Sequence, residues 1–238
     1  MKKQDIEFKV RKDTLRGSLF IPSGKGPFPG VIYFHGNGGN GEKYYEWGDK
    51  FAKRGILSLA FNFRGCGRSE GDYFSQTHQD AFEDAKTAFK FLLKQNVDPN
   101  KIGIIGGSFG GFIAAMILPE IITKSLVLLS PSAHDDPKTT KLDIGPLEKE
   151  IEYFADKNNW LDSVGYKNIA NFTGRLLVIK SENDENVPAF VVDRYFEKAV
   201  SSSKKEMRII KGADHRLSTQ RMRDNAFRLM LNWFLETL

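Results

Sequence analysis

Mainly apolar segments alternate with longer amphipathic segments along most of the chain. The apolar segments are residues 31–34, 56–61, 102–105, 126–129 and 176–179, and a shorter one is 208–210. Segments that are apolar at nearly every position are typical of strands buried on both faces, as in a parallel sheet covered by helices. Two further strands are predicted near the N-terminus, over residues 6–10 and 15–21.

The amphipathic segments carry apolar residues one helical turn apart, which predicts helices. The clearest covers residues 79–95, and Thr77 and Asp80 have the spacing of a capping box. Other predicted elements are helices over 42–53 and 109–118, after Pro188 and from about Ser218, and a turn over 98–100. This alternation predicts an α/β fold with a mostly parallel central sheet and helices on both faces.

Residues 132–172 interrupt the alternation. They separate two predicted strands by about forty residues, whereas such connections usually have about two to six. The segment has its own helical pattern at residues 147–154 and carries the aromatic residues Trp160, Tyr166 and Phe172. We therefore expect one domain over residues 1–238, with a cap insertion at about 132–172.

Composition excludes several classes of protein. The chain has 238 residues, one cysteine and four histidines. The lone Cys66 excludes a disulfide framework and a cysteine-cluster metal site, and no His-Glu-x-x-His pattern is present, so we expect neither a metal nor a cofactor. No apolar run approaches the roughly 18 residues of a membrane span. The basic N-terminus has no apolar stretch behind it, so we expect a cytoplasmic protein without membrane attachment.

The main chemical motif is Gly106-Gly107-Ser108-Phe109-Gly110-Gly111. It follows a predicted buried strand and precedes a predicted helix, which is the strand–turn–helix context of a nucleophile elbow. Such a turn holds the serine hydroxyl clear of the sheet, and flanking glycines avoid collisions with the neighbouring strand and helix. We predict that Ser108 is a nucleophile rather than an ordinary serine in a glycine-rich turn.

A serine hydroxyl needs a base to activate it and a third group to orient the base. In this arrangement the chain order is serine, acid, histidine. His215 is the one histidine after position 134 and follows the last predicted strand, so it is the predicted base. His35 ends a strand beside glycines and is expected to brace its loop, whereas His78 and His134 are poorly placed as bases.

Asp184 is the predicted acid because it lies just past a predicted strand. Glu182 and Glu185 flank it and are expected to be solvated. Asp135 and Asp136, which follow the preceding strand, remain the alternative acids.

The oxyanion of an acyl-transfer reaction needs two fixed hydrogen-bond donors. The backbone N–H of Phe109 is the first candidate, because it follows the nucleophile at the start of a helix. The backbone N–H of Asn37, in the glycine-rich segment after the third strand, is the second. A phosphate loop is disfavoured because no Lys-Ser/Thr pair follows these glycines. A dinucleotide site is disfavoured because no acidic residue lies about twenty positions on.

The sequence resembles the α/β-hydrolase superfamily over nearly its whole length. The matching residues are His35-Gly36, Arg64-Gly65-x-Gly67-x-Ser69, Gly106-x-Ser108-x-Gly110-Gly111, Asp184-x-x-Val187-Pro188 and Asp214-His215. Within the superfamily it is similar to small bacterial esterases of the cinnamoyl/feruloyl type. It is also similar to the catalytic domains of oligopeptidases and acylaminoacyl-peptidases. Because these 238 residues include no β-propeller of the kind those peptidases carry, we expect an esterase.

The resemblance implies an α/β-hydrolase fold, a cap between the sixth and seventh strands, and a structural role for residues 64–69. The predicted function is hydrolysis of carboxylic esters of small to medium acyl or aromatic acids, through an acyl-enzyme on Ser108. A thioesterase or a small-peptide or amide hydrolase with the same triad is the alternative, and a non-catalytic binding protein is a second. Acyl length and oligomeric state stay open.

The net charge of +5 could indicate an anionic partner. Its distribution argues otherwise: residues 1–26 and 204–238 each carry +4, while residues 134–170 carry −3. Without aromatic residues interleaved among the basic ones, we expect no nucleic-acid binding and a small-molecule ester as partner. Arg216, Arg221 and Arg223 follow His215 closely, and one of them could reach the mouth of the site and favour anionic esters.

Overall fold

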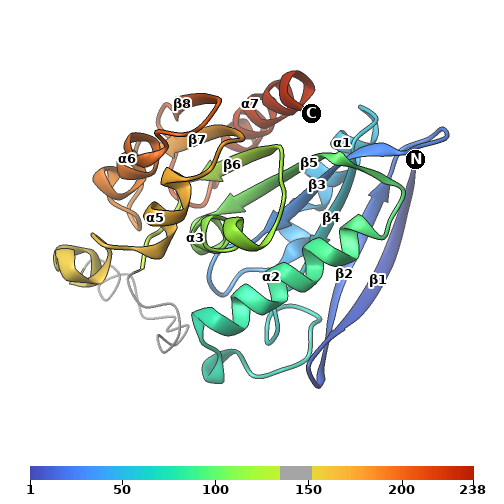
Figure 1. Ribbon diagram of the computed structural model, residues 1–238, viewed down its shortest axis with the longest axis horizontal. Coiled ribbons are helices and arrows are strands. Elements are labelled where there is room, and N and C mark those ends of the chain that lie inside the picture. The colour runs from blue at the N-terminus through green and yellow to red at the C-terminus, as the bar shows by residue number, and fades with distance from the viewer. Residues whose placement is uncertain (135–151) are drawn as a thin grey trace.

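The computed structural model describes residues 1–134 and 152–238, which form one eight-stranded sheet (Figure 1). The strand order is β1-β2-β4-β3-β5-β6-β7-β8. The strands are β1 (Lys2–Val10), β2 (Asp13–Ile21), β3 (Phe28–Phe34), β4 (Leu57–Phe61), β5 (Val97–Gly107), β6 (Ser125–Leu129), β7 (Arg175–Ser181) and β8 (Lys204–Ile210). The β1–β2 and β2–β4 pairs are antiparallel and the other pairs are parallel, so the predicted mostly parallel sheet is confirmed.

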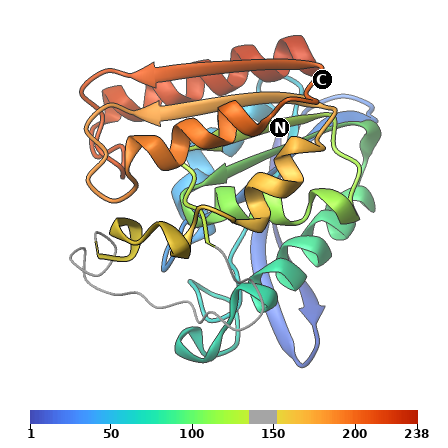
Figure 2. The same cartoon turned by 60° about the vertical axis from the view of Figure 1, so that its left-hand side comes forward.

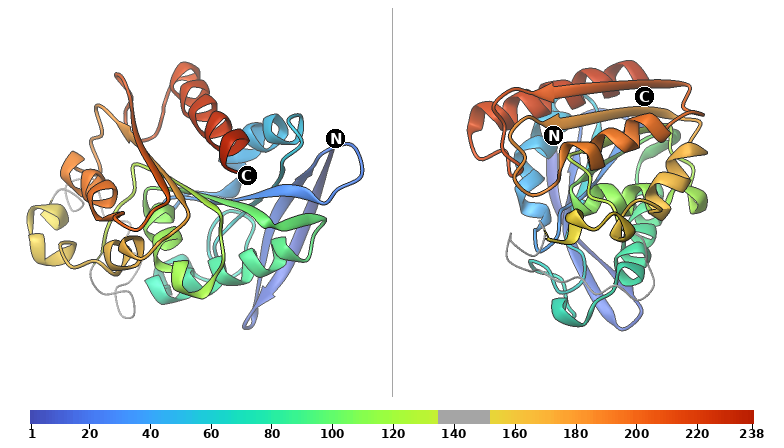
Figure 3. Two further views of the ribbon diagram at one scale, coloured as in Figure 1. Left: turned by 45° about the horizontal axis from the view of Figure 1, so that its top comes forward. Right: turned by 90° about the vertical axis from the view of Figure 1, so that its left-hand side faces the viewer.

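Helices cover both faces of the sheet, as predicted. The α-helices are α1 (Tyr45–Ala52), α2 (His78–Leu93), α3 (Phe109–Met116), α5 (Val164–Ala170), α6 (Ala189–Lys198) and α7 (Gln220–Thr237). Short 3₁₀ helices are η1 (Gly41–Tyr44), η2 (Tyr73–Ser75), η3 (Leu118–Glu120) and η4 (Lys157–Asn159). Figure 3 shows α1 and α7 on one face and α2 and α3 on the other. Figure 2 shows α5 between α3 and α6, with which it is in contact.

One hydrophobic core lies on each face of the sheet, because successive side chains of a strand point to opposite faces. In β3, Ile32 and Phe34 pack into the core under α2 and α3, whereas Val31 and Tyr33 pack into the core under α1 and α7. All four side chains are buried. The apolar runs in the sequence therefore have no polar alternate positions, since both faces are covered.

The predicted turn over residues 98–100 was wrong, because β5 already begins at Val97. The prediction failed because the segment has features of both a strand and a turn. The pairing of β5 with β3 jumps from Phe28–Val97 to Gly30–Ile102, so the residues between leave the ladder. Within this irregularity the N–H of Asn100 donates to Oδ1 of Asp98 at 2.9 Å. The predicted capping box of α2, by contrast, is confirmed.

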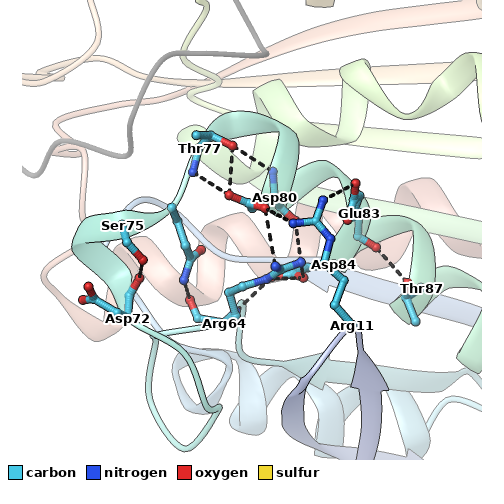
Figure 4. Close-up of polar contacts among 10 residues, drawn as sticks. Arg11, Arg64, Asp72, Ser75, Thr77, Asp80, Glu83, Asp84 and Thr87 are labelled. Atoms are coloured by element: carbon cyan, nitrogen blue, oxygen red, sulfur yellow. Dashed lines mark hydrogen bonds and ion pairs between the residues drawn. The ribbon is translucent and has the colours of Figure 1, made fainter.

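The loop after β4 is held against α2 by a buried ion pair (Figure 4). The guanidinium of Arg64 donates to Oδ1 of Asp84 through Nε at 2.9 Å and through Nη2 at 2.6 Å. Arg64 also contacts Asp80 at 3.4 Å, and Asp80 caps α2 by accepting from the N–H of Thr77 at 3.0 Å. The side chain of Gln76 donates to the carbonyl of Arg64. These contacts agree with the structural role expected of residues 64–69.

The predicted cap insertion lies partly outside the described residues, which omit 135–151. In the part that the structure describes, Trp160 and Tyr166 are buried, and the Tyr166 hydroxyl donates to the carbonyl of Val191 at 2.9 Å. Asn168 of α5 donates to the carbonyl of Met116 in α3 at 3.0 Å. No described helix has the length and apolar character that crossing a membrane requires.

Candidate active site

Ser108 occupies a sharp turn between β5 and α3. Its backbone has φ 52° and ψ −121°, outside the regions that side-chain-bearing residues ordinarily adopt. A Cβ at Gly106 would overlap the carbonyl of Gly110, and a Cβ at Gly110 would overlap the carbonyl of Phe34. The N–H of Ser108 donates to the carbonyl of Leu129 in β6 at 2.9 Å. The turn is therefore fixed by close backbone packing that tolerates glycine alone at positions 106 and 110.

Three sequence-predicted residues lie in one hydrogen-bonded row. His215 Nε2 is 3.0 Å from the Oγ of Ser108, and His215 Nδ1 is 2.8 Å and 2.9 Å from the two carboxylate oxygens of Asp184. Because a carboxylate can only accept, Nδ1 carries the proton in the neutral imidazole. Nε2 then faces the serine hydroxyl with its lone pair, as a base must.

Asp184 is fixed by backbone donors as well as by His215. Its Oδ1 accepts from the N–H of Val187 at 2.8 Å and from that of Asn186 at 3.1 Å. Burial alone would raise the pKa of Asp184, but the hydrogen bond and charge of His215 and the Val187 N–H outweigh it, so the pKa is lowered. Asp184 is accordingly a carboxylate at neutral pH.

The two carboxylates that flank Asp184 also brace the site. The N–H of His215 donates to Oε2 of Glu185 at 3.1 Å, and the N–H of Gly212 donates to Oε2 of Glu182 at 2.8 Å. Both glutamates are exposed, as predicted, yet they tie the His215 loop to the Asp184 loop. Sequence reasoning missed this role, because side chains from loops about thirty residues apart make the contacts.

His35 braces the glycine-rich loop after β3, as predicted. Its ring is buried, its Nε2 accepts from the N–H of Phe63 at 3.1 Å, and its Nδ1–H donates to the carbonyl of Gly36 at 2.8 Å. Burial lowers the pKa of His35 to about 4, so the ring is neutral. A Cβ on Gly36 would lie 3.3 Å from the Cβ of Ser108, which places this loop directly beside the serine.

The predicted oxyanion donors come from two segments next to Ser108, the start of α3 and the loop after β3. Phe109 begins α3, so its N–H is one of those that a helix leaves without an internal acceptor. Asn37 lines the same cavity as Ser108, and its side-chain oxygen accepts a hydrogen bond from the Tyr73 hydroxyl. Tyr73 reaches it from η2, which follows the loop that Arg64 anchors.

His78 and His134 pack against each other on the far side of Phe109. Their ring centroids are 4.6 Å apart, and those of His78 and Phe109 are 5.3 Å apart. His134 Nε2 is 3.1 Å from the Oγ of Ser132, and burial, with the neighbouring His78, lowers the pKa of His134 well below its usual value. This pairing could not be predicted from the sequence, because the two residues lie on segments far apart in the chain.

A cavity of about 490 Å³ opens at Ser108. Its lining comes from the loop after β3, from η1 and α1, from the ends of β5 and β6, from the loops around Asn186 and His215, and from the start of α7. Neither Asp184 nor Phe109 is among its lining residues. Within residues 1–134 and 152–238, no group of three or more His, Cys, Asp or Glu side chains could hold a metal ion.

The sheet order, the helices on both faces and the turn at Ser108 define an α/β hydrolase, as the sequence resemblance implied. The family model of the prolyl oligopeptidase family matches residues 43–238, and the chain belongs to that family. Over 168 residues it is 29% identical to Esterase EstD of Thermotoga maritima, an alignment that covers 66% of this chain and 36% of EstD. The chain thus spans about a third of the length of that curated relative.

Solved structures share the fold. The Pyrococcus horikoshii acylaminoacyl peptidase superposes with a TM-score of 0.77 at 19% identity, covering 100% of this chain and 42% of the peptidase. Est1E of Butyrivibrio proteoclasticus, solved with ferulic acid bound, superposes with a TM-score of 0.73 at 17% identity, covering 97% of this chain and 99% of Est1E. At these identities the likeness concerns the fold alone.

Proposed function

We propose that this protein is a serine hydrolase that cleaves carboxylic esters of small to medium acyl or aromatic acids. The observation that carries the proposal is the hydrogen-bonded row from Asp184 through His215 to Ser108. Membership of the prolyl oligopeptidase family and the similarity to Esterase EstD support a hydrolase of the esterase or peptidase type.

In the first half-reaction, Ser108 Oγ forms a bond to the ester carbonyl carbon while its proton passes to His215 Nε2. Asp184 stabilises the imidazolium that results and keeps the ring in the required tautomer. The backbone N–H groups of Phe109 and Asn37 stabilise the negative charge on the carbonyl oxygen. When the C–O bond breaks, His215 returns the proton to the departing alcohol.

In the second half-reaction, water adds to the acyl group on Ser108. His215 takes a proton from this water as its oxygen bonds to the carbonyl carbon. The proton then goes to Ser108 Oγ as the acyl–oxygen bond breaks, which releases the carboxylic acid. None of these steps requires a redox partner, since the reaction is a displacement at carbon.

Thioesters and small amides would react through the same groups, and family membership makes a peptidase the foremost alternative. A binding protein without catalysis is disfavoured because serine, base and acid are all in place. A panel of acetyl, butyryl, octanoyl and feruloyl esters, with matched thioesters and amides, distinguishes these substrate classes.

The decisive variants are Ser108→Ala and His215→Ala. Each should lower kcat for 4-nitrophenyl butyrate by roughly 10⁴-fold or more. Ser218→Ala is the matched control, because this exposed serine lies close to His215 in the chain. Near-normal turnover by Ser108→Ala, with the wild-type melting temperature, would refute the mechanism.

The acid is tested separately. Asp184→Asn should lose about 10³-fold or more in kcat, because an amide favours the wrong imidazole tautomer. Asp135→Asn should retain most of the activity. If Asp135→Asn loses more activity than Asp184→Asn, the acid is Asp135 and not Asp184. The alternative acids Asp135 and Asp136 lie outside the described residues, so this comparison decides between them.

A further inference from the structure

Three basic side chains line the cavity at Ser108. They are Lys43 of η1, Arg216, which directly follows the proposed base, and Arg223 near the start of α7. Among the described residues, the lining contains neither aspartate nor glutamate. The cavity wall therefore carries three formal positive charges next to the proposed nucleophile.

Neutral oxygens hold two of these cations, Lys43 and Arg223, in place. Lys43 Nζ donates to the carbonyl of Arg216 at 3.2 Å. The guanidinium of Arg223 donates to the carbonyls of Leu217 and Ser218 at 3.1 Å and 3.0 Å. A carbonyl fixes the position of a cation and leaves its charge uncompensated.

No ion pair within residues 1–134 and 152–238 involves Lys43, Arg216 or Arg223. Lys50 of α1, in contrast, pairs with Glu46 at 2.6 Å and with Asp224 at 2.7 Å. Within the described residues, a neighbouring lysine is thus neutralised, while the cavity cations have no carboxylate within ion-pair distance.

Nearby acids offset the cavity charge only in part, and Asp224, the partner of Lys50, also attracts Arg223. Oδ1 of Asp214 accepts from the N–H of Ser218 at 3.0 Å, and Oε2 of Glu185 accepts from the N–H of His215. Burial, together with repulsion from Arg216 and Arg223, lowers the pKa of Lys43, although Asp214 opposes the shift. An anion in the cavity would relieve this repulsion.

From this arrangement we propose that the enzyme prefers esters that carry an anionic group, which Lys43, Arg216 and Arg223 bind during attack by Ser108. The cavity also contains Tyr44, Trp47, Leu129 and Leu217, which suit a carbon segment between the ester and the anion. This inference rests on the proposed ester hydrolysis. The anionic group sits in either the acid or the alcohol part of the ester.

The test compares matched esters with and without a carboxylate, after correction for hydrolysis without enzyme. In the acyl arm, mono-4-nitrophenyl adipate is compared with 4-nitrophenyl hexanoate, which has the same number of acyl carbons. In the alcohol arm, 3-acetoxybenzoate is compared with phenyl acetate. The measured quantity is the ratio of kcat/KM for the anionic ester to that for the neutral one, so a general loss of activity cancels.

In at least one arm the wild-type ratio should exceed that of every cavity variant. Lys43→Gln, Arg216→Gln and Arg223→Gln should each lower the ratio by about two- to fivefold, as expected for partly exposed charge pairs. Arg221→Gln is the matched control, because Arg221 is exposed and does not line the cavity, and it should leave the ratio unchanged. Raising the ionic strength should lower the wild-type ratio.

Two failures are distinguishable. Hydrolysis of neutral esters that depends on Ser108, with a ratio that none of the three cavity variants changes in either arm, refutes the anion preference and leaves the proposed function intact. Ester hydrolysis that does not depend on Ser108 refutes the proposed function and the anion preference with it.

Discussion

Arg64 and the cavity cations Lys43, Arg216 and Arg223 lie in two regions of the molecule, and they differ in how their charge is balanced. Arg64 is 5% exposed, and its guanidinium makes two hydrogen bonds to the carboxylate of Asp84. The cavity cation Arg216 is exposed, and the ammonium of Lys43 donates to a carbonyl. Arg64 is neutralised inside the protein, whereas in the part of the chain that the structure describes the cavity cations have no carboxylate within ion-pair distance.

This difference distinguishes a charge that stabilises the fold from a charge that is available to bind a ligand. Burying an ion is costly unless a partner and further hydrogen bonds compensate it, so the Arg64–Asp84 pair cannot lose one member without loss of stability. An exposed cation is solvated and needs no such partner. Cations collected around a cavity without carboxylates therefore contribute little to folding, and their position is best explained by a ligand.

The largest expected effect concerns the buried pair. Asp84→Ala leaves the guanidinium of Arg64 buried with only the more distant Asp80, so the free energy of unfolding should fall by about 3 kcal/mol or more. Urea unfolding followed by circular dichroism measures it. Asp224→Ala, which removes an exposed partner of Lys50, should cost no more than about 1 kcal/mol, and equal losses for the two variants would contradict the contrast.

A second effect depends on pH, because His35 is buried in neutral form. Its ring takes up a proton at about pH 4 in the native state and at about pH 6.5 in the unfolded chain. The unfolded state therefore binds more protons in this window, and stability falls as the pH drops from about 6.5 to about 4, by on the order of 3 kcal/mol for this group.

The matched variant for the pH effect is His35→Gln, which keeps an acceptor for the N–H of Phe63. Between pH 6.5 and 5 the slope of unfolding free energy against pH should be smaller in the variant, by up to about 1.4 kcal/mol per pH unit. Equal slopes in the two proteins would show that His35 is not held neutral.

The smallest effect is expected at the cavity. Lys43→Met removes a charge that Arg216 and Arg223 repel, so the free energy of unfolding should change by no more than about 0.5 kcal/mol. Lys50→Met is the control. Because it removes two ion pairs, it should lower the free energy of unfolding by up to about 1 kcal/mol. A loss for Lys43→Met as large as that for Asp84→Ala would make the cavity cations structural.

The sequence predicted most of the fold because the determining features are local. Runs such as residues 31–34 are apolar at every position, and Thr77 and Asp80 begin α2 with a capping box. The start of β5 escaped prediction because Pro99 and Asn100 favour a turn. Only the pairing of Val97 with Phe28 shows that the strand begins before them.

The site residues were predictable where a reactive side chain has a recognisable position relative to the predicted strands and helices. Ser108 lies between a strand and a helix, and His215 follows the last strand, so the chain order alone brought them together. The contacts of Lys43 with Arg216 and of Tyr73 with Asn37 were not predictable. They join segments 173 and 36 residues apart, and a polar residue in either segment resembles any solvated side chain.

The central claim, that Ser108 is an activated nucleophile, can be tested by mass spectrometry of the intact protein after treatment with a fluorophosphonate. The structure leads us to expect one adduct per chain, mapped by peptide analysis to Ser108, and its loss in Ser108→Ala and His215→Ala. Either of two results would contradict this claim. One is stoichiometric labelling at another residue, and the other is ester hydrolysis that continues after Ser108 has been modified in every chain.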